Sequence, residues 1–212
     1  MVKMKRVTRE KQIILAARVA SMVFTPFYLP ILGLVVLFFL SYLSQYPPSY
    51  KFFVLAVVYF FTILLPTFLI HLYRRYQGWS LIELGHKERR IVPYLISILC
   101  YFTCLYLMEQ MHIPSFMRSI VAAALIIQIV CALINVWWKI STHTAAIGGV
   151  AGALFVFSEV FRFNPTWWFC LVLGIAGILG TSRMILRQHT LLQVVVGFLV
   201  GFACALFAIL KL

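Results

Sequence analysis

Long apolar runs follow one another along almost the whole chain, and only short polar links separate them. A helix that crosses a bilayer needs about 20 mostly apolar residues, and the run Phe52–Leu72 reaches this length without a formal charge. Hydrophobic residues make up 64% of the chain and charged residues 11%, whereas soluble domains have about half apolar and about a quarter charged residues. The sequence therefore predicts an integral membrane protein.

Seven runs are long enough to be spans. The first, Val19–Leu43, is interrupted by Pro26 and Pro30, so we expect it to be kinked. Residues 1–18 contain six Lys and Arg residues and are predicted to form an interfacial segment, while residues 19–212 form a single transmembrane domain. This organisation is an all-α, polytopic transmembrane helical bundle of six to seven spans. The other spans are expected at Phe52–Leu72, Ile91–Met108, Ser119–Trp138, Thr144–Phe161, Thr166–Thr181 and His189–Leu210.

Two of these spans contain glycines four residues apart. Gly148 and Gly152 lie in the fifth span, and Gly197 and Gly201 lie in the last. Small residues at this spacing allow membrane helices to approach closely. We therefore expect close packing at these positions.

The net charge of +13 has a different meaning here than in a soluble protein. In a soluble chain it would suggest nucleic-acid binding, but in this chain Lys and Arg must lie outside or between the spans. No nucleic-acid partner is expected. The basic residues are instead interpreted as topology signals and phosphate ligands.

Three basic or histidine-containing links are predicted to lie on one face of the membrane, because two spans separate each from the next. They are Lys87–Arg90, Lys139–His143 and Arg183–His189. Ionisable groups at a membrane are costly and often mark a functional site. The three links therefore predict an anion site at one membrane interface. All five cysteines lie in apolar runs, and no metal-ligand spacing is present, so neither a metal nor another cofactor is expected.

The third link has the most specific pattern. Ser182 and Arg183 are followed by five residues, then His189, and then Gln193 four residues further on. This segment resembles the third motif of the type 2 phosphatidic acid phosphatase superfamily, also called lipid phosphate phosphatases.

Two further segments extend the resemblance over about residues 85–201. Ile140–His143 (Ile-Ser-Thr-His) is similar to the second motif, which ends in serine-glycine-histidine. Lys87–Pro93 lies at the place of the first motif but departs from its spacing. The order of the motifs and the two spans between them also agree with the superfamily, which implies a helical bundle with its active site at one interface.

The resemblance implies catalytic roles for two histidines. His189 would attack phosphorus and form a phosphohistidine, and His143 would protonate the leaving group. Gln193 stands where the superfamily has aspartate, which fixes the tautomer of the nucleophilic histidine and stabilises its charged form. A glutamine carbonyl can accept the ring N–H but supplies no negative charge. In the serine-protease triad, replacing aspartate by asparagine costs about ten-thousandfold in rate.

The phosphate ligands are implied in the same way. Arg183 would bind phosphate oxygens through its planar guanidinium. Ser141 and nearby backbone amides would add donors at a helix N-terminus. Lys87 and Arg90 are candidates from the first link, and Lys139 is a candidate substitute for a missing first-motif cation.

Three functions are consistent with these residues. The first is a metal-independent lipid phosphate phosphatase that hydrolyses a phosphomonoester or diphosphate through a phosphohistidine. Its candidate substrates are polyprenyl phosphates, phosphatidate-like lipids and phosphorylated glycolipids. Gln193 and the damaged first and second motifs favour an impaired member that binds or transports a lipid phosphate. The third function is a lipid phosphotransferase.

The basic residues also predict an orientation. Fourteen of the 18 Lys and Arg residues lie on the face of the three links. Nine remain against four on the other face when five residues that could bind phosphate are left aside, namely Lys87, Arg89, Arg90, Lys139 and Arg183. The positive-inside rule then places the motif face in the cytoplasm, and the compact chain suggests a bacterial inner membrane.

Overall fold

The computed structural model of the protein describes residues 2–40, 45–78 and 91–211, and this part of the chain is helical apart from short connections. A π-helical turn, η2, joins α3 to α4. The elements are α1 (Val2–Val23), α2 (Leu29–Leu40), α3 (Pro48–Tyr59), η2 (Phe60–Leu64), α4 (Leu65–Gln77), α5 (Ile91–Gln110), α6 (Ser115–Trp137), α7 (Thr142–Phe161), α8 (Thr166–Ile185) and α9 (Leu191–Lys211).

Six helical segments in the described ranges are long and apolar enough to cross a membrane. The first comprises α3, η2 and α4, and the others are α5 to α9. Outward-facing side chains are largely apolar, including Phe52 at 76% exposed and Trp167 at 85% exposed, as expected for a lipid-facing surface. The prediction of an all-α polytopic membrane bundle is confirmed.

The first expected span, Val19–Leu43, is not one continuous helix, because its described residues are divided between α1 and α2. The chain turns between α1 and α2, where the amide of Tyr28 donates to the carbonyl of Thr25 at 3.1 Å. Pro26 lies in this turn and has no amide hydrogen to donate. Pro30 is the second residue of α2, a position at which a helix tolerates proline.

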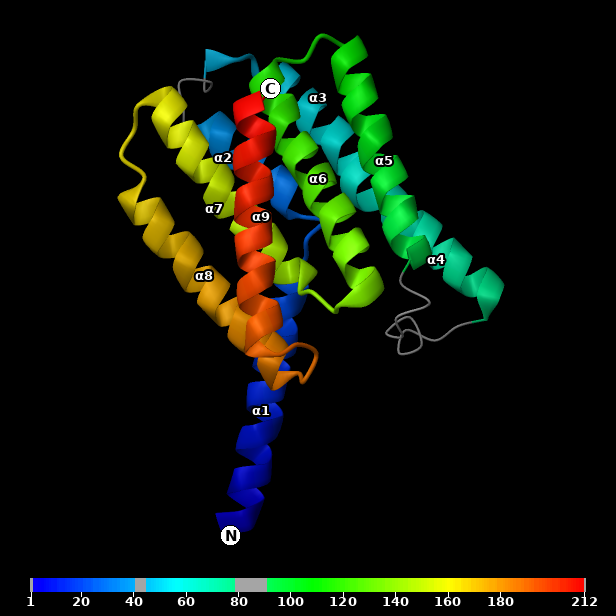
Figure 1. The fold of residues 1–212 in the computed structure, drawn as a ribbon, viewed down its shortest axis with the longest axis vertical. Helices are drawn as coiled ribbons and strands as arrows, with labels where there is room; N and C mark the ends of the chain where they lie inside the picture. The colour runs from blue at the N-terminus through cyan, green and yellow to red at the C-terminus, as the bar shows by residue number, and fades with distance from the viewer. Residues whose placement is uncertain (1, 41–44, 79–90, 212) are drawn as a thin grey trace.

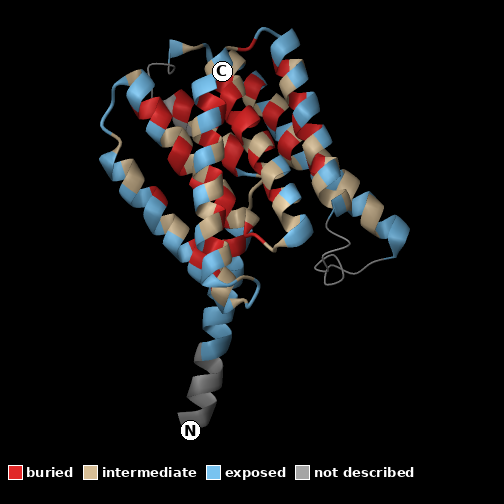
Figure 2. Cartoon of the chain, in the orientation of Figure 1, coloured by how far each residue is buried: buried red, intermediate tan, exposed pale blue. Residues whose placement is uncertain are grey.

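The ends of the elements fall into two groups (Figure 1). The N-terminus, the α6–α7 connection and the α8–α9 connection lie toward the lower end of the bundle, and α1 projects from it. The C-terminus and the α5–α6 connection lie at the opposite end. Buried residues concentrate on the inward faces of the helices (Figure 2), with Tyr101, Met117 and Val121 fully buried in the largest core cluster.

The two glycine pairs place α7 directly against α9, and this pair has the most extensive contact between helices. A Cβ at Gly148 would collide with the carbonyl oxygen of Phe198, and one at Gly201 would collide with that of Ala145. A Cβ at Gly197 would lie 2.7 Å from the carbonyl oxygen of Ser141. The backbones therefore touch with no side chain between them, which brings the start of α7 beside the start of α9.

Candidate functional site

The connection from α8 to α9 places Arg183 and His189 at the same end of the bundle. The amide of Gln188 donates to the carbonyl of Arg183 at 3.1 Å and that of Arg187 to Met184 at 2.9 Å. Arg187 has a positive φ of 52°, the left-handed conformation that commonly ends a helix. Arg183 thus lies in the last turn of α8, and His189 lies two residues before α9.

Gln193 closes the first turn of α9 by a reciprocal pair of hydrogen bonds. Its side-chain Oε1 accepts from the amide of Thr190 at 3.2 Å, and its own amide donates to Oγ1 of Thr190 at 3.4 Å. This is a capping box, in which a threonine and a glutamine three residues later satisfy each other's amides. The side-chain carbonyl of Gln193 is therefore held at the helix N-terminus.

The same carbonyl contacts the imidazole of His189, because Nδ1 lies 3.2 Å from Oε1 of Gln193. A backbone amide can only donate, so the Gln193 atom facing the amide of Thr190 must be the oxygen. An oxygen of this kind accepts only, and Nδ1 of His189 must then hold the proton. Nε2 is left with the lone pair in the neutral ring, which is the tautomer needed for nucleophilic attack by Nε2.

Ser141 caps the N-terminus of α7. Its hydroxyl accepts from the amide of Thr144 at 3.4 Å as the N-cap of α7, and its amide donates to the backbone carbonyl of Gln193 at 3.4 Å. The side chain of Ser141 is fully buried. Ser141 thus joins the two helix N-termini, and both favour negative charge nearby.

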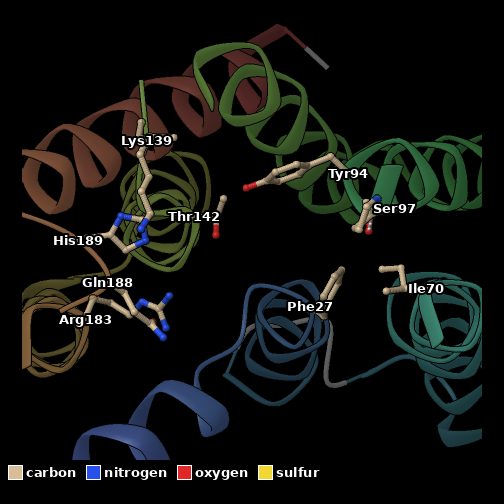
Figure 3. Close-up of a pocket in the computed structure, with 11 residues that line it drawn as sticks. Phe27, Ile70, Tyr94, Ser97, Lys139, Thr142, Arg183, Gln188 and His189 are labelled. Carbon is tan, nitrogen blue, oxygen red and sulfur yellow. Dashed lines mark hydrogen bonds between the residues drawn. The ribbon is translucent and has the colours of Figure 1, made fainter. Parts of the chain in front are cut away.

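A cavity of about 450 Å³ opens between these helix ends and the helices α4 and α5 (Figure 3). The side chains of Lys139, Arg183 and His189 lie on one side of it, and Phe27 and Ile70 lie on the other. The cavity therefore has one polar, cationic side and one mainly apolar side. Its lining residues are Phe27, Ile70, Pro93, Tyr94, Ser97, Lys139, Ile140, Thr142, Arg183, Gln188 and His189.

Ser21 of α1 bonds Arg183 and lies near His143. Nη1 of Arg183 donates to the hydroxyl of Ser21 at 2.6 Å. The ring of His143 lies near the backbone of Ser21 and interacts electrostatically with Arg183 and His189. Nδ1 of His143 is buried and has no hydrogen-bond partner among the described residues.

Asn135 connects the cavity wall to the segment before α7. Its Nδ2 donates to the hydroxyl of Tyr94 at 3.2 Å and to the carbonyl of Cys131 at 2.8 Å. Its Oδ1 accepts from the amide of Ile140 at 3.3 Å. The Tyr94 hydroxyl points across the cavity toward Thr142 (Figure 3).

The predicted site residues occupy three kinds of place. The cavity is lined by His189, Arg183 and Lys139. The side-chain oxygen of Gln193 contacts Nδ1 of His189. His143 and Ser141 do not line the cavity but lie in contact with residues of the site. Lys87 and Arg90 lie outside the described residues, so their placement stays a prediction.

Sequence reasoning missed several residues of this region, among them Ser21, Tyr94, Asn135, Thr142 and Gln188. Asn135 carries a usable signal, because an amide within an apolar helix needs a partner. Thr142 and Gln188 lie inside the motif segments, each next to a candidate catalytic histidine.

The side chains on the polar side of the cavity are cationic or neutral, which suits an anion rather than a metal ion. Within the part of the chain that the structure describes, no three His, Cys, Asp or Glu side chains are grouped closely enough to hold a metal.

Comparison with known protein families agrees with this site. The family described as the PAP2 superfamily matches residues 132–211, which include the second and third motifs. The match supports membership of the type 2 phosphatidic acid phosphatase superfamily and confirms the resemblance over this range. The match suggests phosphatase-type activity on phosphate esters. No curated protein and no solved structure gives a significant match to the chain.

Proposed function

We propose that the protein is a lipid phosphate phosphatase that works through a phosphohistidine. The observation that supports this most directly is the contact from which the tautomer of His189 is inferred. Its Nδ1 faces Oε1 of Gln193, whose identity as oxygen follows from the amide of Thr190. His189 lines the cavity, and its Nε2 then has the lone pair that a nucleophile requires.

The proposed reaction has two steps. Nε2 of His189 attacks phosphorus, the bond from phosphorus to the leaving oxygen breaks, and His143 gives that oxygen a proton. Water then attacks the phosphohistidine, its proton returns to His143, and inorganic phosphate leaves with His189 restored. Arg183 and Lys139 balance the negative charge during both steps, since phosphoryl transfer mainly requires positioning and positive charge.

A lipid substrate fits the two sides of the cavity. The phosphate would lie against Lys139, Arg183 and His189, and the first part of the tail against Phe27 and Ile70. A phosphorylated lipid has the same polarity along its length. Because the cavity lies between membrane-spanning helices, the rest of the tail can remain in the bilayer.

The test is phosphate release by the purified protein from a panel of lipid mono- and diphosphates, with a chelator present. His189→Ala should abolish release, while His112→Asn, at the opposite end of the bundle, should leave it unchanged. Labelled phosphate should also remain on the wild-type protein after rapid denaturation at alkaline pH and be absent from His189→Ala. Release that survives in His189→Ala would reject the mechanism.

A second candidate function has one observation in its favour. The group facing Nδ1 of His189 is a neutral amide, which cannot compensate a charged imidazole as a carboxylate would. A member without turnover that binds or transports a lipid phosphate would fit this. It predicts saturable binding of the lipid phosphate without phosphate release, both in the wild type and in Gln193→Asp.

We also propose that the site faces the cytoplasm of a bacterial inner membrane. The basic N-terminal segment and the site-bearing connections lie toward one end of the bundle, and the C-terminus lies at the other (Figure 1). Alkaline phosphatase fused after residue 212 should then be active and green fluorescent protein fused there should be dark. The reverse pattern would place the site outside.

A further inference from the structure

The helix α1 lies outside the segment that matches the superfamily, yet it reaches the candidate site. It packs along α8, and one of its faces is buried there. Ala17 is 4% exposed and Ser21 is 7% exposed, whereas Val19 and Met22 are 51% and 65% exposed. Positions four apart share a helix face, so Ala17 and Ser21 mark the side that faces the bundle.

The buried hydroxyl of Ser21 accepts a hydrogen bond from a charged group. The distance from Nη1 of Arg183 is 2.6 Å, in the range of strong charge-assisted bonds. The guanidinium is planar and its donors have a fixed geometry. The bond at Nη1 therefore restricts how the guanidinium group of Arg183 is oriented toward the cavity that Arg183 lines.

The same residue lies near the second histidine of the site. The His143 ring lies close to the backbone of Ser21, while Nδ1 of His143 has no hydrogen-bond partner within the described ranges. One turn of α1 thus bonds Arg183, at the end of α8, and lies near His143, at the start of α7. These two residues come from separate helices, and Ser21 lies near both.

We propose that Ser21 is a positioning residue of the phosphate site and that α1 is part of that site. Ser21 holds Arg183 in the orientation that binds phosphate. This inference rests on the proposed function only in that Arg183 binds a phosphate group; it requires no turnover. It extends the functional unit to residue 21, well before the matched segment.

The test measures binding of inorganic phosphate and of orthovanadate to the purified full chain, from the ligand-dependent rise of its thermal unfolding midpoint. Ser21→Ala should weaken the apparent Kd by about tenfold, the effect expected for losing a hydrogen bond to a charged group. Ser21→Thr keeps the hydroxyl and should restore binding. Met22→Ala, one residue further along α1 and exposed, should bind as the wild type does.

A double-mutant cycle separates positioning from a general effect on the fold. Ser21→Ala combined with Arg183→Ala should bind no more weakly than Arg183→Ala alone, because the hydroxyl acts through Arg183. Equal weakening by Ser21→Ala and Ser21→Thr, additive effects in the cycle, or unchanged binding in Ser21→Ala would each overturn the inference.

The outcomes also distinguish this inference from the proposed function. Wild-type protein that binds phosphate but releases none from any lipid would reject the proposed phosphatase activity. The role of Ser21 would then be decided by the binding measurements on the Ser21 variants. Wild-type protein that binds neither anion would reject both the phosphate site and the role of Ser21.

Discussion

Oε1 of Gln193 lies 3.2 Å from Nδ1 of His189 and also accepts from the amide of Thr190. One side-chain oxygen therefore both caps α9 and orients the candidate nucleophile. An aspartate, as in the superfamily pattern, would bring a negative charge to the same ring nitrogen. This chain has the contact between residue 193 and His189 but lacks the negative charge of the aspartate.

Replacing Gln193 by aspartate is expected to raise the turnover number by about tenfold, since a charge-assisted hydrogen bond is roughly twice as strong as a neutral one. Gln193→Ala should lower turnover and also destabilise the protein by about 1 kcal/mol through loss of the cap. Steady-state kinetics on the best lipid phosphate checks both.

Gln193→Glu is the control, because it keeps the length of the side chain while adding the charge. A gain in Gln193→Asp but not in Gln193→Glu would show that the length of the side chain matters. A loss in Gln193→Asp as large as in Gln193→Ala would contradict this interpretation.

Asn135 should stabilise the site by joining two of its segments. Asn135→Ala removes the bonds to the Tyr94 hydroxyl, the Cys131 carbonyl and the Ile140 amide. We expect a loss of about 1–3 kcal/mol in the free energy of unfolding, because the remaining partners are partly buried, together with a fall in kcat/KM.

Tyr94→Phe is the matched variant for Asn135→Ala, since it removes only one of the three bonds. It should retain most of the stability and most of the activity in denaturant titrations and kinetic assays. If Tyr94→Phe lost as much as Asn135→Ala, the link to the Ile140 amide would have no separate role.

The contact between α7 and α9 should tolerate no added methyl group. Gly201→Ala places Cβ against the carbonyl oxygen of Ala145, and overpacking of this kind typically costs about 1–3 kcal/mol. Gly174 lies on α8, and a Cβ added there would meet no atom within 4 Å, so Gly174→Ala should be neutral or stabilising by up to about 1 kcal/mol. Thermal unfolding in detergent compares the two, and equal midpoints would contradict the close packing.

The apolar side of the cavity should select lipids by their tails. Ile70→Trp places a larger side chain on that wall and should raise the KM for a long-chain lipid phosphate more than for a short-chain one. Phe68→Trp is a suitable control, because Phe68 is 58% exposed on the same helix. An equal rise of KM for both chain lengths would place the tail elsewhere.

The sequence predicts the local relationships well. The spacing of His189 and Gln193 anticipates their contact, and the two glycine pairs anticipate the close packing of α7 and α9. The glycine contacts follow from residue size and helical spacing. His189 lies two residues before α9, so its contact with Gln193 comes from the capping box at the helix start and not from a shared helix face. Pro26 indicates a break in the first apolar run, although not that α1 and α2 become separate helices.

Other relationships depend on packing between segments that are distant in the chain. Ser21 and Arg183 are 162 residues apart, and nothing in either segment indicates the other. The place of Ser141 beside His143 predicts a phosphate ligand, but its hydroxyl is buried as the cap of α7. Its role toward phosphate stays a prediction, as do those of His143, Lys139, Lys87 and Arg90.

The direct backbone contact between α7 and α9 gives the two walls of the cavity different mechanical properties. His143 and His189 belong to two helix starts that cannot slide apart without breaking that contact, whereas Ile70 and Tyr94 belong to α4 and α5 on the other wall of the cavity. A change in bilayer thickness would therefore be absorbed mainly by the wall that meets the lipid tail. Membrane composition should then alter which lipids are accepted more than how fast a bound phosphate reacts.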